Sequence, residues 1–177
     1  MWEQDECDFG TVTLGLGHLH LVLHAFRGGF GPERPRRDPR RKALLAAAPG
    51  EQHTFGLAMV GEFLRRAGWE VQDACGCSRP ELAALVRGDW FAIAALTASE
   101  ALRLPGLGET VHALRRASRN RGLGVLVGGR VFEARPDRVA LVGADAAASD
   151  AAASDAGQSV RQAERLWVAA LAPARLG

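Results

Sequence analysis

A glutamate and a histidine two residues apart, Glu51 and His53, are the side chains of this sequence best suited to holding a metal ion. Neutral imidazole is a common metal ligand, and a carboxylate that accepts a hydrogen bond from its second nitrogen orients the ring. The pair follows a short apolar run, residues 43–48, and a Pro-Gly turn. Spacing alone favours the plainer interpretation, in which His53 caps or fills the first turn of a helix. The loops that follow the other strands favour a ligand site.

These loops are built from small residues. Leu96-Thr97-Ala98-Ser99 follows the third predicted strand, Gly128-Gly129 ends the fourth, and Gly143-Ala144-Asp145 follows the fifth. Ligands of open α/β sheets bind beyond the carboxyl ends of the strands, where glycine allows a bulky group to approach the backbone. The phosphate-binding patterns GxxxxGK[ST] and GxGxxG do not occur in the sequence. The loops therefore predict a deep slot rather than a phosphate cradle.

Strand-like and helix-like runs alternate from residue 43 onward, which predicts parallel βαβ units. The expected fold is a flavodoxin-like (Rossmann-like), doubly wound sheet of five parallel strands in the order 2-1-3-4-5, with an N-terminal accessory helix. A tandem AAASD repeat at 146–155 favours the start of a helix, with a loop as the alternative. The predicted strands cover residues 43–48, 69–74, 90–96, 124–129 and 139–143, and the predicted helices cover 55–67, 80–86, 109–119 and 160–171.

Composition limits the function classes. The chain has 177 residues and 18.8 kDa, with 47% hydrophobic and 24% charged residues, which is typical of one globular domain with a short appendage. No apolar stretch is long enough to span a bilayer, and the first residues are acidic, unlike a signal peptide. Three cysteines are too few for a disulfide framework. We expect a cytoplasmic, reduced protein that does not contact a membrane.

Two segments precede the α/β domain, which we expect to span residues 43–177. Residues 1–26 contain an amphipathic helix, and residues 27–42 form a Pro/Gly linker with seven basic and two acidic residues, a net charge of +5. Because the whole chain carries +2, the remainder carries −3. The basic run Arg34–Lys42 is a solvated linker, a weak or indirect DNA contact, or a docking site for an acidic partner. Without a helix-turn-helix or zinc motif, independent sequence-specific DNA binding is not expected.

Other candidate ligands carry weaker signals. His20 and His24 stand four residues apart on the predicted N-terminal helix, a spacing that can clamp a metal, although a polar helix face is the favoured interpretation. Cys75 and Cys77 form a CxC pair after the second predicted strand. With no further cysteine ligands nearby, we interpret the pair as structural.

The ordered patterns Glu51-x-His53-x-x-Gly56, Ala94-Ala95-Leu96 and Gly128-Gly129 resemble the DxHxxG, SxL and GG signatures of cobalamin-binding domains. The resemblance spans residues 43 to about 172. It implies that His53 binds cobalt from below while the displaced base tail of the cofactor enters a slot lined by the later motifs. It departs at Glu51, which is longer than Asp, and at Ala94, whose missing hydroxyl Thr97 or Ser99 could supply. The residues expected to bind the cofactor are Glu51, Gln52, His53, Thr54, Phe55, Gly56, Ala94, Leu96, Thr97, Gly128, Gly129, Gly143, Ala144 and Asp145.

Within that family, the segment from Phe9 to Leu16, the basic linker and Val142-Gly143-Ala144-Asp145 resemble most the AerR/PpaA photosynthesis antirepressors, related to the haem-sensing domain of AppA. This resemblance implies a light- or redox-responsive regulator without catalytic activity, which binds adenosyl- or hydroxocobalamin and acts on a repressor of the PpsR/CrtJ type. A haem sensor on the same fold and a corrinoid-carrier subunit of a methyltransferase are the alternatives.

Overall fold

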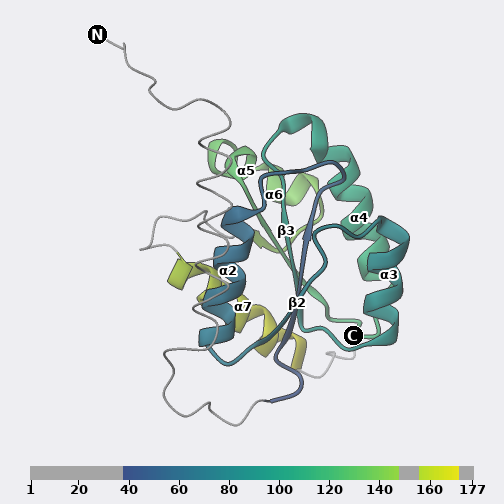
Figure 1. Ribbon diagram of the computed structural model, residues 1–177, viewed down its shortest axis with the longest axis vertical. Coiled ribbons are helices and arrows are strands. Elements are labelled where there is room, and N and C mark those ends of the chain that lie inside the picture. Colours follow the sequence, from purple (N-terminus) through teal and green to yellow (C-terminus); the bar gives the residue numbers. More distant parts are fainter. Residues whose placement is uncertain (1–37, 148–155, 172–177) are drawn as a thin grey trace, which may run out of the picture. The chain divides into compact units, whose positions relative to one another are not determined.

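The computed structural model describes residues 38–147 and 156–171, and its core is a parallel sheet (Figure 1). The sheet has five strands in the order β2-β1-β3-β4-β5, and every neighbouring pair is parallel. The strands are β1 (Lys42–Ala47), β2 (Glu70–Asp73), β3 (Ile93–Thr97), β4 (Gly124–Gly128) and β5 (Ala146–Ala147). This order confirms the predicted flavodoxin-like fold and places the switch point between β1 and β3, where strand order reverses.

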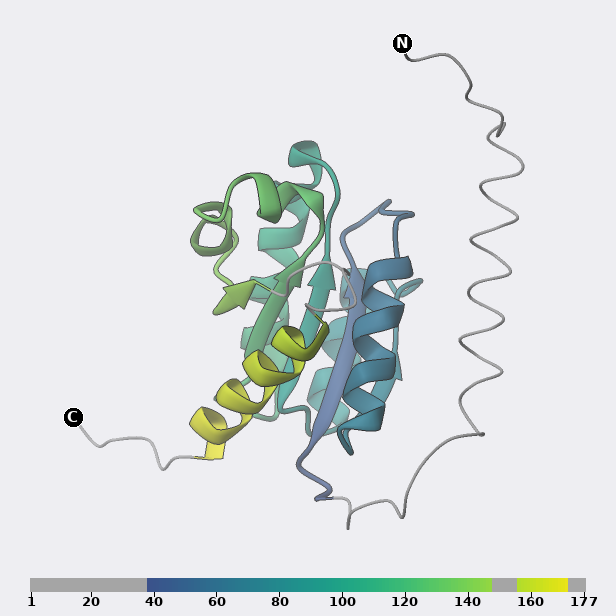
Figure 2. The same ribbon diagram turned by 90° about the vertical axis from the view of Figure 1, so that its left-hand side faces the viewer.

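Helices cover both faces of this sheet (Figure 2). One face is covered by α2 (Phe55–Arg66) and α7 (Ala156–Leu171), and the other by α3 (Arg79–Gly88) and α4 (Leu104–Ala117). Three shorter elements complete the described chain: a 3₁₀ turn, η2 (Ala101–Arg103), and the helices α5 (Arg130–Ala134) and α6 (Arg138–Leu141).

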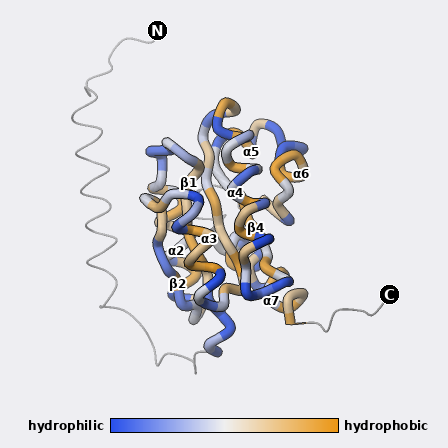
Figure 3. Tube along the Cα trace, turned by 90° about the vertical axis from the view of Figure 1, so that its right-hand side faces the viewer, coloured by the Kyte–Doolittle hydropathy of each residue, from blue (hydrophilic) through white to orange (hydrophobic). Residues whose placement is uncertain are grey.

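The core divides into two layers because side chains alternate along each strand. On β3, Ile93 and Ala95 pack toward α2 and α7, whereas Ala94 and Leu96 pack toward α3 and α4. The central strands β1, β3 and β4 are buried on both faces, which explains their nearly continuous apolar sequence (Figure 3). The side of the sheet that a residue of these strands faces therefore follows from its position parity alone.

The fifth strand is not where the sequence predicted it. The predicted strand 139–143 contains most of α6 and a turn, and β5 instead comprises Ala146 and Ala147, which pair with Leu126 and Val127. Short apolar runs do not distinguish strand from helix, and here Pro136 and Asp137 start a helical turn directly before the run. The helical interpretation of the AAASD repeat is wrong for Ala146 and Ala147, and its remaining residues lie outside the described ranges.

Other boundaries differ by a few residues. The helix predicted from Glu109 begins at Leu104, where Pro105 occupies the first turn, and α5 was not predicted. The strand predicted from Trp90 begins at Ile93. The predicted N-terminal helix, with His20 and His24, lies outside the described residues, as does the linker up to residue 37.

Ion pairs hold the last two residues of the basic linker, Arg41 and Lys42, against the domain. Lys42 is the first residue of β1 and forms ion pairs with Glu70, at 2.9 Å, and with Asp89. Arg41 forms an ion pair with Glu164 of α7, and its guanidinium lies 4.7 Å from the ring centroid of Trp167. The charges of these two residues are therefore engaged within the domain.

Candidate functional site

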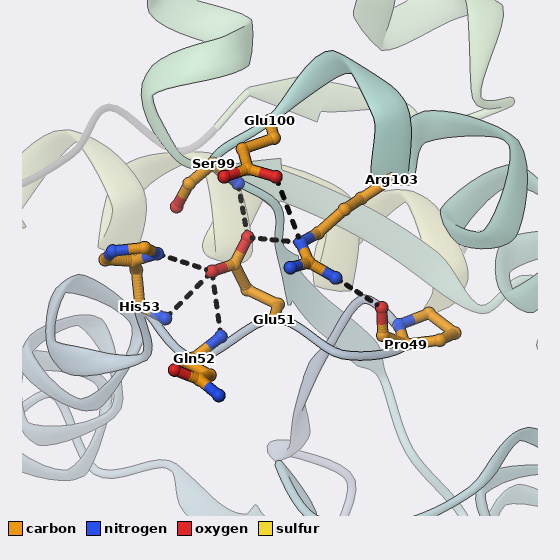
Figure 4. Close-up of polar contacts among 7 residues, drawn as sticks. All are labelled: Pro49, Glu51, Gln52, His53, Ser99, Glu100 and Arg103. Carbon is orange, nitrogen blue, oxygen red and sulfur yellow. Dashed lines mark hydrogen bonds and ion pairs between the residues drawn. The ribbon is translucent and has the colours of Figure 1, made fainter.

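The loop between β1 and α2 is organised around a buried carboxylate, that of Glu51 (Figure 4). Only 1% of its side chain is exposed. Its Oε1 accepts hydrogen bonds from the backbone N–H groups of Gln52, at 2.9 Å, and His53, at 2.8 Å. Its Oε2 accepts a 2.6 Å bond from the backbone N–H of Ser99, which follows β3. One carboxylate thus ties together the two loops that flank the switch point.

Two opposing influences act on the pKa of Glu51. Burial raises it, but the hydrogen bonds from the backbone N–H groups of His53 and Ser99, with that of the His53 ring, outweigh burial and hold the pKa below the ordinary value. Glu51 is therefore ionised at neutral pH. Its charge favours a proton on the nitrogen of His53 that faces it.

That nitrogen is Nδ1, which lies 2.8 Å from Oε1 of Glu51. Because an ionised carboxylate can only accept, the tautomer that this contact selects in the neutral ring has its proton on Nδ1 and a lone pair on Nε2. The His53 side chain is 74% exposed although its partner is buried, so the ring stands at the carboxyl edge of the sheet with Nε2 free to bind. Figure 4 shows the ring held by Glu51 from one side only. An imidazole oriented in this way can bind a metal ion through Nε2.

Arg103 completes the loop pair, and sequence reasoning missed it. Its Nη1 donates a 3.0 Å hydrogen bond to the carbonyl oxygen of Pro49, and its Nε lies 3.6 Å from Oε2 of Glu51 and 3.8 Å from Oε2 of Glu100. Nothing in the local sequence marks this arginine, because the residues it joins are far apart along the chain.

A small cavity lies beside this edge, between α2 and the sheet. Leu57 and Val60 form its helix side, and its volume of about 10 Å³ holds little more than one water molecule. The sheet side is lined by Ala95, Leu96, Thr97, Leu126 and Gly128.

A second polar group on this face was also missed. Ser159 of α7 is fully buried, and its Oγ has no hydrogen-bond partner among the described residues. It lies one helical turn before Ala163, which packs on the sheet face that α2 and α7 cover. Burying an unpartnered hydroxyl costs free energy, so this layer suits a group that brings hydrogen-bonding atoms between helix and sheet.

The structure brings some of the predicted site residues together and not others. Thr97 and Gly128 line the cavity, and so does Leu96, although its side chain packs in the opposite core layer. Ala94, assigned to the serine position of the second motif, packs in the opposite core layer and does not reach the cavity. By strand parity, Thr97 is the hydroxyl residue of β3 on the cavity side.

The backbone conformation at position 129 requires glycine. Its φ is +106°, and a Cβ atom there would lie 2.0 Å from the carbonyl oxygen of Ala98. Any side chain would therefore disrupt the contact between the loops after β3 and β4. Gly128, in contrast, lines the cavity itself.

The sequence predicted a cofactor-binding loop after the fifth strand, formed by Gly143, Ala144 and Asp145, but the structure places these residues elsewhere. They precede β5 instead of following it, so they lie toward the amino ends of the strands, away from His53. Asp145 accepts a 2.7 Å hydrogen bond from the backbone N–H of Val125 and a 2.8 Å bond from Arg115. Its role in the structure is to join β4 and α4 to the segment before β5.

This position leads to a stability prediction. Replacing Asp145 with alanine leaves the buried N–H of Val125 without its acceptor and should lower the free energy of unfolding by about 1–3 kcal/mol. Corrinoid affinity should be unchanged. Chemical denaturation and a cofactor titration of the same variant check both halves, and a loss of affinity without a loss of stability would contradict this placement.

The remaining predicted residues have structural places. Thr54 is the N-cap residue of α2, and Phe55 and Gly56 are its first two residues.

Cys75 and Cys77 are free thiols, and burial, with Asp73 nearby, raises the pKa of Cys75 to about 12. Within residues 38–147 and 156–171, no group of three or more His, Cys, Asp or Glu side chains could hold a metal ion. Any metal at this edge must bring most of its own ligands.

Comparison with known proteins also indicates a B12 binding domain. Residues 41–155 match the family model of the B12 binding domain. A 20.5 kDa protein of the bchF–crtJ intergenic region of Rhodobacter capsulatus is 28% identical over 144 residues, which cover 81% of this chain and 74% of that protein.

Two solved structures share the fold. A cobalamin-binding protein from Desulfitobacterium hafniense aligns with TM-score 0.61 and 22% identity, covering 91% of this chain and 72% of that one. The monomethylamine corrinoid protein of Methanosarcina barkeri aligns with TM-score 0.60 and 16% identity, covering 88% and 67%. None of the described helices is long and apolar enough to cross a membrane. The match over residues 41–155 places this chain in the B12 binding domain family.

Proposed function

We propose that this protein binds a corrinoid, with His53 as the lower ligand of cobalt, and works as a regulator rather than as an enzyme. The observation that carries the binding step is the pairing of an exposed imidazole with a buried, ionised carboxylate. The corrinoid, when bound, would supply a cobalt centre whose chemistry can respond to light or redox state.

The residues of this chain would do three things. Glu51 holds the Nδ1 proton of His53 and keeps the Nε2 lone pair available. Thr97 and Ser159 offer hydroxyl groups on the layer between the helices and the sheet. Gly128 leaves that layer free of side-chain bulk at the end of β4.

The cavity must widen for this function. A space for about one water molecule cannot accept an aromatic base, so a base tail would enter only if α2 or α7 moves away from the sheet. Movement of this kind gives the protein two states that a cofactor can select by differential affinity, which is what a regulator requires.

We further propose that the partner is a repressor of the PpsR/CrtJ type. The support is the resemblance of residues 142–145 and of the N-terminal segments to the antirepressor branch, together with the location of the 28% identical Rhodobacter relative between bchF and crtJ. A pull-down of the purified repressor by the corrinoid-loaded and corrinoid-free full chain tests this part. Equal or absent capture in both states would contradict it.

The cofactor itself is tested by parallel absorption titrations of the full chain with hydroxocobalamin and with haemin. Imidazole also suits iron, so both titrations are needed. We expect saturable, stoichiometric spectral changes with hydroxocobalamin, and weaker binding of haemin. Tight haemin binding without corrinoid binding would replace the proposal with a haem sensor.

A further inference from the structure

A groove runs between α3 and α4, on the opposite face of the sheet from α2, α7 and the cavity. Its volume is about 740 Å³. Four small residues, Ala83, Gly108, Ala113 and Ala117, leave its floor free of long side chains. Small residues at such a place allow another backbone to approach the two helices closely.

The side chains around this floor are mainly basic. Arg79, Arg87 and Arg116 line the groove with His112, and Glu109 is the single acidic residue among its lining. Glu109 is already paired with Arg79 at 2.6 Å. Arg87 and Arg116 are exposed and have no acidic partner within residues 38–147 and 156–171. The groove therefore carries a positive charge that the described part of the domain does not neutralise.

The extent of the groove lining indicates the shape of the ligand. On α3 the lining runs from Arg79 to Arg87, eight residues or about 12 Å along a helix axis. The two arginines without an acidic partner in the described part of the domain, Arg87 and Arg116, belong to the last turns of α3 and α4. The ligand that matches the groove is elongated and carries acidic groups that can reach these two arginines.

We propose that this groove binds an acidic peptide segment of a partner protein. Its Glu and Asp side chains would pair with Arg87 and Arg116 while its backbone lies on the small-residue floor. Single-stranded nucleic acid is disfavoured because the groove lining contains no Phe, Tyr or Trp side chain on which successive bases could stack. Duplex DNA is disfavoured because it is usually read by an element that projects into its grooves, whereas α3 and α4 flank a depression. The proposal does not depend on corrinoid binding, since the groove and His53 lie on different parts of the domain.

Fluorescence anisotropy with the full chain tests the groove. The probe is a fluorescein-labelled 15-residue peptide of Glu and Ala, and the reference is the same peptide with Gln in place of Glu. The double variant Arg87→Glu/Arg116→Glu should lower affinity for the Glu peptide by about tenfold or more, because each change replaces an attraction with a repulsion. The Gln peptide should bind weakly to every protein.

The matched control reverses two exposed arginines on the other face of the sheet, Arg161→Glu/Arg165→Glu in α7, with the same change in net charge. The affinity of this control variant for the Glu peptide should change by less than about twofold, apart from the screened, long-range effect of the altered net charge. A second variant, Ala83→Leu, fills the floor without altering charge and should also weaken binding, with unchanged far-ultraviolet circular dichroism.

Three outcomes would overturn the proposal. Equal losses in both double variants would mean that only net charge matters. No binding of the Glu peptide to the wild-type chain would remove the ligand class. Binding of a 20-base-pair duplex that depends on Arg87 and Arg116, and that exceeds binding of the peptide, would assign the groove to DNA.

Discussion

Replacing His53 with alanine should lower affinity for hydroxocobalamin by more than about 100-fold. This loss exceeds the roughly 10–100-fold loss that is typical when a residue supporting a metal ligand is removed. The reason is that the other histidine of the described residues, His112, lies on α4 and offers no second imidazole at this edge. The fold should persist, because the side chain is 74% exposed and packs against little. Absorption titration gives the affinity, and thermal denaturation gives the stability.

A control makes this result specific. His112→Ala removes an exposed imidazole from α4, on the other face of the sheet. This variant should bind hydroxocobalamin as the wild-type chain does. Wild-type affinity in His53→Ala, with the control intact, would show that cobalt is held elsewhere or not held by imidazole.

Replacing Glu51 with glutamine should lower corrinoid affinity by about 10–100-fold although His53 remains. A glutamine side chain presents one N–H₂ group where the carboxylate presents an acceptor, so it cannot accept from Gln52, His53 and Ser99 together. The loss of this acceptor should also lower the free energy of unfolding by about 1–3 kcal/mol. The control is Glu62→Gln, a buried glutamate of α2 paired with Arg66, which should lose stability without losing affinity.

The effect of Glu51→Gln on the free energy of unfolding should depend on pH. Because the pKa of Glu51 lies below its ordinary value in the folded protein, its ionised form stabilises the fold above about 4.5, and this contribution is lost as pH falls through the lower folded pKa. The stability difference between the wild-type chain and Glu51→Gln should therefore be largest near neutral pH and shrink in acid below pH 4.5. A difference that grows on acidification would mean that Glu51 is protonated when the protein is folded.

Sequence patterns predicted the central strands and the position of the Glu51–His53 loop because these depend on local signals. Buried parallel strands read as apolar runs, and the Pro-Gly turn marks where β1 ends. The fifth strand failed because it has only two alanines, and a neighbouring apolar run offered a stronger but helical pattern.

The parts of the site that sequence could not show depend on contacts between distant segments. Arg103 reaches Pro49 across 54 positions, and Ser159 becomes notable only because packing buries its hydroxyl without a partner. The choice between Ala94 and Thr97 required the exact register of β3, since a shift of one residue moves a side chain to the other face.

The central claim is that Nε2 of His53 becomes the lower ligand of cobalt, and electron paramagnetic resonance of the bound, reduced Co(II) cofactor tests it most directly. The chain is prepared with ¹⁵N-labelled histidine and, separately, at natural abundance. Coordination by His53 predicts that the splitting of each cobalt line changes from a triplet to a doublet on labelling, and that this doublet disappears in His53→Ala. A triplet that persists in the labelled protein would show that cobalt keeps the nitrogen of its own base and would contradict the account.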